Sequence, residues 1–348
     1  MVLGGHKGQF PRCRALCIMR RRQCWELLKY RGRRRSRPRG TTMLFPRALG
    51  AAALLVRAAV ALTPEATTPA GHPIYFAPSG SRVKQNGVNL DVFAPNGTLI
   101  HTFANFISST GKPQRAPQRR QSLSTTQASA TVNITTTDFI QALNASVVVP
   151  PAPSTFDSQI VFVSAGVVSL DPTTGEPASI LRSALQYGGS WAQGGPFYTY
   201  VIQLELPGPE PGYLQVSAIG GNATSQSIEP GQTLDPYIVF DSELTEEEPG
   251  TYWYITGFAN VGGDLSLEIG WETPPPMVIV ELEEEGVTSA SDYPTGSVVL
   301  QNINLNMTVS GPPEISWTTT VDPSADVQIN VEQDGSQNAQ IEFVFPDA

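Results

Sequence analysis

The chain has 348 residues and a formal net charge of −9 at pH 7, and this length allows two or three domains. The charge is unevenly distributed. After Ala61, 7 Lys and Arg residues stand against 30 Asp and Glu residues, so that part of the chain has a net charge of −23. Such an acidic chain excludes nucleic acid and anionic membranes as predicted partners.

An export signal is predicted at residues 43–61. Arg47 precedes a short apolar run that ends in Ala59-Val60-Ala61; this order is typical of a secretory signal, and the run is too short to span a membrane. Because a signal should begin at the true start of a protein, residues 1–42 are interpreted as a mispredicted extension. The alternative is a basic nucleic-acid-binding segment. We therefore expect an extracellular protein, in solution or associated with a cell wall.

Two further features agree with export. All three cysteines lie before residue 25, so the exported chain has no disulfide and depends on a large hydrophobic core for stability. The chain also contains Asn-x-Ser/Thr sequons, the acceptor sites of N-glycosylation. The predicted glycosylation sites are Asn96, Asn133, Asn144, Asn222 and Asn306.

Residues 62–120 are predicted to form a basic prosegment with short strands, ahead of an acidic domain at 121–348. The segment contains six of the seven basic residues found after Ala61, and it ends in Arg119-Arg120 within a Pro/Gln-rich stretch. Such stretches are accessible to processing proteases. The prosegment would lie on the acidic domain by charge complementarity and be released by cleavage. Alternatively, the arginine pair is an ordinary surface feature of a linker.

Beyond Arg120 the hydrophobic pattern has a period of two, with Pro, Gly, Asn and Asp turns between the segments. This pattern predicts an all-β fold, an antiparallel double-sheet sandwich of jelly-roll type. The neighbourhoods of 137–143 and 178–186 are candidates for a short helix. The predicted strands are 130–135, 144–149, 159–168, 197–206, 213–219, 236–240, 251–258, 264–271, 277–283, 297–309, 315–321, 326–332 and 339–345.

The residue types available for chemistry are few. After Arg120 there is no His, Cys or Lys, and Arg182 is the only basic side chain. This excludes a Ser–His or Cys nucleophile, a zinc site, a phosphate loop with its Lys and a Schiff base. No cofactor or metal site is predicted. Carboxylates and amides remain, which can hydrolyse glycosides or peptides, or bind a ligand.

Two clusters of glutamates stand out. Glu246-Glu247-Glu248 precedes Pro249-Gly250 and is typical of an exposed turn. Glu281 and Glu283 end an apolar strand, and alternate residues of a strand point to the same face. These two carboxylates are therefore either a pair on one face of a sheet or the solvated end of a strand.

Between residues 140 and 310 the chain contains a series of motifs in a characteristic order: Val147-Val148-Val149-Pro150-Pro151, 161–167, 180–188, 197–206, 228–232 and Val278-Ile279-Val280-Glu281. This order resembles that of the fungal glutamic peptidases (eqolisins). The resemblance implies a concanavalin A-like double-sheet fold, a glutamate that acts as general base on water, and a glutamine amide that stabilises the oxyanion.

At the positions of the catalytic pair, the chain departs from the family. Glu281 matches the base, with Glu283 facing the same way, but the glutamine position is occupied by Arg182. Gln186 is on the same face but about 13 Å further along a strand. Two interpretations are open. Arg182 pairs with the glutamates, keeps them ionised and locks the cleft, or Arg182 itself donates to the oxyanion.

The sequence therefore favours a non-catalytic or degenerate glutamic-peptidase-like protein that binds a glycan or a polypeptide on a concave face. The alternatives are an acid endopeptidase with Glu281 or Glu283 as base, and a carboxylate-pair glycoside hydrolase. The aromatic residues predicted to line the concave face are Tyr198, Tyr200, Tyr252, Trp253 and Tyr254.

Overall fold

A computed structural model of the chain describes most residues after Leu62, all within a compact unit that spans residues 57–348. The predicted extension and export signal, the Arg119-Arg120 pair and the sequon at Asn222 lie outside the described residues. The described ranges are 62–107, 126–134, 138–189, 194–206, 212–217, 227–261, 265–323 and 325–347.

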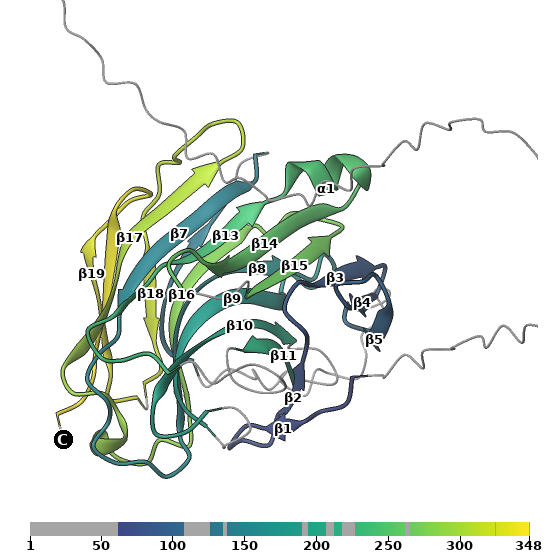
Figure 1. The fold of residues 1–348 in the computed structure, drawn as a ribbon. Helices are drawn as coiled ribbons and strands as arrows, with labels where there is room; N and C mark the ends of the chain where they lie inside the picture. The colour runs from purple at the N-terminus through teal and green to yellow at the C-terminus, as the bar shows by residue number, and fades with distance from the viewer. Residues whose placement is uncertain are drawn as a thin grey trace, which may run out of the picture. The chain divides into compact units, whose positions relative to one another are not determined.

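The described chain is nearly all β and forms two large sheets, which confirms the predicted sandwich (Figure 1). Sheet A has the strand order β1 (Ala66–Thr67), β2 (Pro73–Phe76), β11 (Gly212–Ser217), β10 (Tyr198–Leu206), β9 (Pro177–Gly188), β8 (Ile160–Leu170), β16 (Met277–Glu285), β6 (Thr126–Asn133) and β18 (Thr318–Val321).

Sheet B has the strand order β19 (Gln328–Gln333), β20 (Ala339–Val344), β17 (Ser297–Met307), β7 (Ile140–Val148), β13 (Pro236–Phe240), β14 (Tyr252–Phe258), β15 (Ser266–Trp271), β3 (Ser81–Asn86), β4 (Asn89–Phe93) and β5 (Leu99–Phe103). A short strand, β12 (Thr233–Leu234), pairs with β7. The described helices are α1 (Ser242–Glu247) and a 3₁₀ turn, η1 (Ala290–Asp292).

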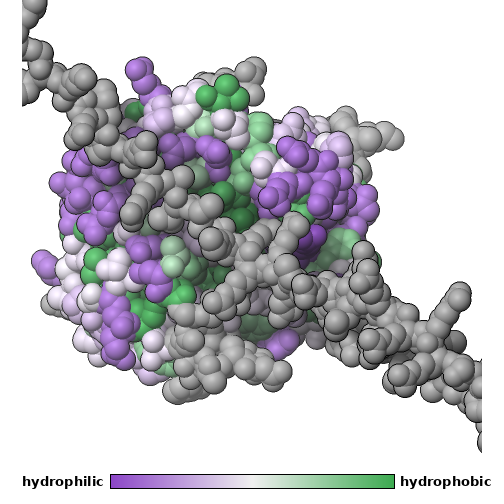
Figure 2. Space-filling view, turned by 45° about the horizontal axis from the view of Figure 1, so that its top comes forward, coloured by the Kyte–Doolittle hydropathy of each residue, from purple (hydrophilic) through white to green (hydrophobic). Residues whose placement is uncertain are grey.

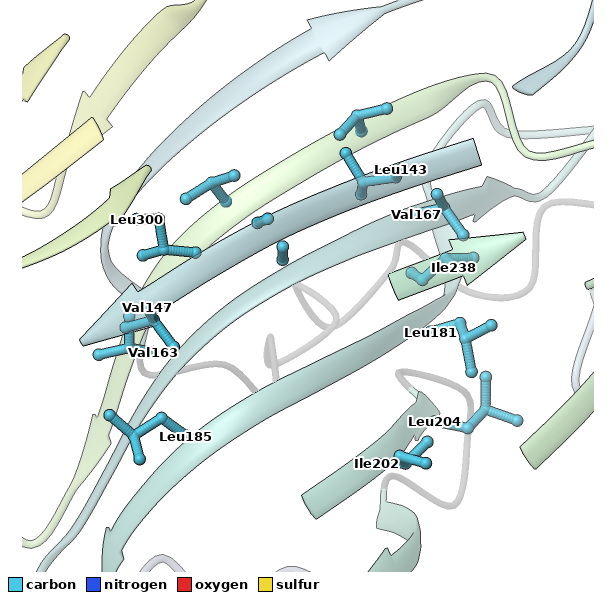
Figure 3. Close-up of a cluster of buried hydrophobic side chains, with 14 of the residues drawn as sticks. Leu143, Val147, Val163, Val167, Leu181, Leu185, Ile202, Leu204, Ile238 and Leu300 are labelled. Carbon is cyan, nitrogen blue, oxygen red and sulfur yellow. The ribbon is translucent and has the colours of Figure 1, made fainter. Parts of the chain in front are cut away.

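The main hydrophobic core lies between the sheets. Leu181 and Leu185 of β9 belong to the same buried cluster as Leu143 and Val147 of β7, and Figure 3 shows side chains from the strands of both sheets converging on it. Alternate residues of each strand supply this core, as the period of two predicted. The residues between these core positions consequently lie on the opposite face of each sheet.

Both candidate helices are wrong, because residues 140–143 belong to β7 and residues 178–186 belong to β9. Strand β9 places Leu181 and Leu185 in the core and Arg182 on the other face; this separation of apolar from polar residues requires a period of two. The helix α1 was not predicted. It is capped by Asp241, which accepts a hydrogen bond of 3.1 Å from Leu244 N, and it contains the exposed Glu246 and Glu247.

Residues 62–107 supply strands to both sheets. β2 pairs in parallel with β11 and β3 pairs in parallel with β15, whereas the other pairings are antiparallel among the described strands. The sheets are therefore mixed rather than purely antiparallel. The physical reason is that these strands come from a distant part of the chain and not from a tight hairpin.

Hydrophilic and hydrophobic residues are interspersed on the face of the molecule shown in Figure 2. Three large hydrophobic side chains are exposed among the described residues: Leu99, Val148 and Val309. Scattered exposed side chains of this kind are normal for a folded protein. Neither described helix has the length and apolar character needed to cross a membrane.

The core position of Leu181 predicts a large effect of truncation. Leu181→Ala removes a fully buried side chain and is expected to lower the free energy of unfolding by about 2–5 kcal/mol. The matched control, Leu99→Ala, changes an exposed leucine and should shift it by less than about 0.5 kcal/mol. Chemical denaturation of both variants measures the difference; equal effects would contradict the assigned core.

Candidate functional site

Arg182 lies in the middle of sheet A, on the face turned away from the main core. It follows Leu181, which belongs to the core, and successive residues of a strand point to opposite faces. Its register partners are Gly166 on β8 and Gln203 on β10. The arginine side chain is 0% exposed, so its charge must be balanced by neighbouring groups.

Two glutamates on β16 supply that balance. Arg182 Nη1 donates to Glu281 Oε1 and Nη2 donates to Glu283 Oε2, and both carboxylates are as buried as the arginine. The third nitrogen, Nε, donates to Gln203 Oε1 at 3.1 Å. The structure thus brings together the three residues that the resemblance singled out, in the pairing that one of the two interpretations predicted. The alternative, that Glu281 and Glu283 form the solvated end of a strand, is wrong because both side chains are fully buried.

A glycine makes this contact possible. β8 lies between β9 and β16, so the guanidinium must pass over β8 to reach the glutamates. At the crossing point β8 has Gly166, where a Cβ atom would lie 3.0 Å from Arg182 Cβ and 2.8 Å from the Leu181 carbonyl oxygen. A larger residue at this position would occupy the space that Arg182 uses.

The glutamates have further partners. Tyr213 of β11 donates its hydroxyl to Glu283 Oε1 at 2.8 Å, and Ser164 of β8 donates to Glu281 Oε1 at 3.3 Å. The guanidinium carbon also lies 5.6 Å from the ring centre of Phe162 and 6.0 Å from that of Tyr213, distances at which a cation is attracted by an aromatic ring.

A third carboxylate, Glu205 of β10, completes the cluster and was missed in the sequence. Its Oε2 lies 3.7 Å from Arg182 Nη1, beyond hydrogen-bond distance, and has no hydrogen-bond partner among the described residues. The buried Gln215 Nε2 is likewise without one in the described structure. A signal existed, because Gln203 and Glu205 are polar residues at alternate positions of an otherwise apolar strand.

The electrostatics follow from burial and mutual attraction. Burial opposes the charged form of Arg182, but attraction to Glu283, Glu281 and Glu205 outweighs it and raises its pKa well above the usual value. Burial also raises the pKa of Glu283, although Arg182 acts in the opposite direction. For Glu205, burial and then repulsion from Glu283 raise the pKa well above the usual range. One arginine cannot balance three buried carboxylates, so Glu205 favours its protonated form.

The other glutamates of β16 have different surroundings. Glu285 is buried and accepts a hydrogen bond of 2.9 Å from Ala70 N, with His72 Nδ1 at 3.4 Å from its other oxygen. Glu284 points to the opposite face of the strand, where burial raises its pKa to about 7 although a hydrogen bond with Tyr293 acts in the opposite direction. The strand end is therefore embedded and not solvated.

The remaining candidate residues are not part of this cluster. Gln186 lies on the same strand and donates to the Gly188 carbonyl oxygen at 2.9 Å. Instead of lining an exposed face, Tyr198, Tyr200 and Trp253 are 2–3% exposed. Tyr198 donates to the Pro151 carbonyl oxygen at 3.0 Å, and it belongs with Tyr200 to the main core. Large amphipathic rings favour burial, which the sequence pattern alone did not separate from ligand binding.

The described sequons differ in exposure. Asn96 and Asn133 are exposed, whereas Asn144 and Asn306 lie half-buried on the face of sheet B that is turned away from the core. Glycosylation requires an accessible side chain, so the first two are the better placed acceptors. Their modification stays a prediction.

The cluster has the composition of a catalytic site but not the accessibility of one. A general base must reach a water molecule and a substrate, whereas Glu281 and Glu283 are fully buried and both engage one guanidinium. Within the described part of the chain, no group of three or more His, Cys, Asp or Glu side chains is arranged to hold a metal ion. The geometry therefore supports charge neutralisation inside the sheet.

Comparison with known proteins adds a distant likeness. No protein-family model matches the sequence, and no curated protein is similar to it. Among solved structures, the chain is similar to a crystal structure of scytalido-glutamic peptidase with a peptide-based transition-state analogue. The TM-score is 0.39 and the identity 12%, over 64% of this chain and 100% of that chain. The likeness concerns the fold alone.

Removal of the buried cation should destabilise the protein strongly. Arg182→Met leaves several carboxylates buried without a positive charge and is expected to lower the free energy of unfolding by about 3–5 kcal/mol at neutral pH. Arg82→Met is the matched control, because Arg82 is 42% exposed and pairs with Glu268; its effect should stay within about 1 kcal/mol. Urea denaturation distinguishes the two, and similar losses would contradict the assigned role of Arg182.

Replacement of Glu205 should stabilise the protein at neutral pH, whereas replacement of Arg182 should destabilise it. The folded-state pKa of Glu205 lies above the unfolded value, so its contribution to stability is present below the unfolded pKa and is lost as the pH rises through the folded pKa. Glu205→Gln preserves the protonated shape. The variant should match the parent protein in acid and become the more stable of the two as the pH rises to neutral. Unfolding curves measured across this range would refute the assignment if the difference were independent of pH.

Proposed function

We propose that this chain is an exported, non-proteolytic β-sandwich protein in which Arg182 replaces a catalytic function with a structural one. The observation that supports this is the pairing of one buried guanidinium with both Glu281 and Glu283. The guanidinium engages both carboxylates, and their complete burial keeps them from the water and substrate that a general base must reach. The resemblance to glutamic peptidases supports the same proposal, because it implies a catalytic glutamine at the position that Arg182 occupies in this chain.

A binding or structural role remains for such a protein, and we propose a glycan or a polypeptide as the ligand. Of the tyrosines first considered for this role, Tyr198, Tyr200 and Tyr254 are buried and Tyr252 is half-buried, so the ligand would mainly contact other surfaces. Extracellular location is part of the same proposal. It is supported by the signal-like residues 43–61 and by the exposure of Asn96 and Asn133.

The activity test uses an acid-denatured substrate protein between about pH 2 and 5, the range in which an acid endopeptidase with a glutamate base is expected to act. The parent protein is expected to leave the substrate intact. Cleavage by the parent protein that disappears in Glu281→Gln would contradict the proposal and establish the acid endopeptidase instead.

A matched variant distinguishes a catalytic site that Arg182 blocks from a site that has lost its other catalytic features. Arg182→Gln restores the amide that the family resemblance predicts at this position. Peptide cleavage that appears only in this variant would support the lock, because the rest of the site would then be competent. Gel electrophoresis or mass spectrometry of the digest detects either result, and the folded state of each variant is checked by circular dichroism.

The binding part of the proposal has its own measurement. Retention of the purified protein on insoluble polysaccharide or on immobilised denatured protein is expected, with bovine serum albumin as the control for non-specific adsorption. Passage through both columns without delay would contradict a glycan or polypeptide ligand.

A further inference from the structure

The N-terminal strands, residues 62–107, extend both sheets. Strand β2 lies beside β11 in sheet A, with Ile74 opposite Tyr213, and β3 lies beside β15 in sheet B, with Val83 opposite Ile269. Figure 1 shows this segment in purple and blue along these strands. Without it, β11 and β15 would be edge strands with unpaired backbone groups, a condition that folded proteins avoid.

The segment also completes the interior of the sandwich. Ile74 is fully buried and packs against Tyr213, the tyrosine that donates to Glu283. Val83, Leu90 and Val92 are equally buried and belong to the main core. The segment therefore contacts both the core and the border of the buried carboxylate cluster.

Polar contacts reinforce the strand pairing. Arg82 Nε donates to Glu268 Oε2 at 2.6 Å, and Lys84 pairs with Glu248. Arg82 and Lys84 are the two Lys and Arg residues of 62–107, and their partners Glu268 and Glu248 belong to the acidic part of the chain. At the other end, Ala70 N donates to the buried Glu285. Individual ion pairs and strand pairing thus both join the segment to the acidic part.

The acidic part is shaped to accept the segment. Gly212 begins β11, and a Cβ atom at this position would lie 2.9 Å from the Pro73 carbonyl oxygen and 3.1 Å from Pro73 Cγ. The close approach of β2 therefore requires the absence of a side chain at Gly212. This fit joins the backbone of Gly212 to the backbone and ring of Pro73, and it holds whether or not the two parts are covalently joined.

We propose that residues 62–107 and 126–347 are two interlocking parts that stay bound without a covalent connection, so that the partner of β11 and β15 is this chain's own N-terminal segment. Cleavage between the parts then produces a two-chain protein and does not release the segment, in contrast to the released prosegment expected from the sequence. The inference does not rest on the proposed function, because its evidence is strand pairing and packing and not the ion pairs of Arg182.

The test uses the full exported chain with a recognition sequence for a specific protease, flanked by Gly/Ser spacers, inserted after Gln121. The protein is cut under native conditions and applied to gel filtration at about 1 μM. Both fragments are expected in one peak at equal stoichiometry, which requires a dissociation constant well below that concentration. Elution of the short fragment by itself, or aggregation of the long fragment, would overturn the inference.

Matched variants locate the interaction. Val83→Asp places an unpaired carboxylate in the core, and the cut variant should lose its short fragment, whereas cut Leu99→Asp changes an exposed residue and should retain it. Gly212→Val provides a second disruption, from the side of the acidic part, should the uncut Val83→Asp chain fail to fold. Retention of the short fragment by both disruptive variants to the same extent as in the parent protein would overturn the assigned contacts.

Discussion

The buried charge of Arg182 is the constraint on which the polar face of sheet A depends. A guanidinium removed from water is tolerated only when its donors and its charge are both satisfied. Here the satisfying groups come from different strands: Gln203 from β10 and the two glutamates from β16. The arrangement holds only if these strands occupy their places across the sheet. The ion pairs thus specify strand order as well as neutralising charge.

The same requirement explains the composition of the neighbouring strands. β8 separates the arginine from its glutamates, and Gly166 at the crossing point has no side chain to obstruct the guanidinium. Glu205 adds a third carboxylate at 3.7 Å from the cation. The excess of negative charge in a medium of low polarity shifts the equilibrium of this group toward its protonated form. A binding surface would be open to solvent, whereas this cluster is closed.

The outer limits of the sandwich are set by residues 62–107. Two sheets of this size expose edge strands unless another segment covers them. The N-terminal strands cover one edge of each sheet, and they run parallel to their neighbours because they arrive from a distant part of the chain. Their buried residues belong to the same core as the rest of the sandwich. The acidic part and its N-terminal segment therefore form one compact unit.

By itself, the sequence determined the fold class and most strand positions after Arg120, although it missed β9, because a sheet with one face in the core imposes a period of two that the local pattern records directly. It also placed Glu281 and Glu283 on one face, and it identified Arg182 as the only basic side chain after Arg120. It did not separate the buried tyrosines Tyr198 and Tyr200 from surface aromatics, since the same residue types suit both places. Only the tertiary structure decided that the carboxylates are enclosed, that Glu205 joins them, and that residues 62–107 complete both sheets. These features depend on which strands become neighbours, and contacts between strands distant in the chain leave no periodic signal in either strand alone.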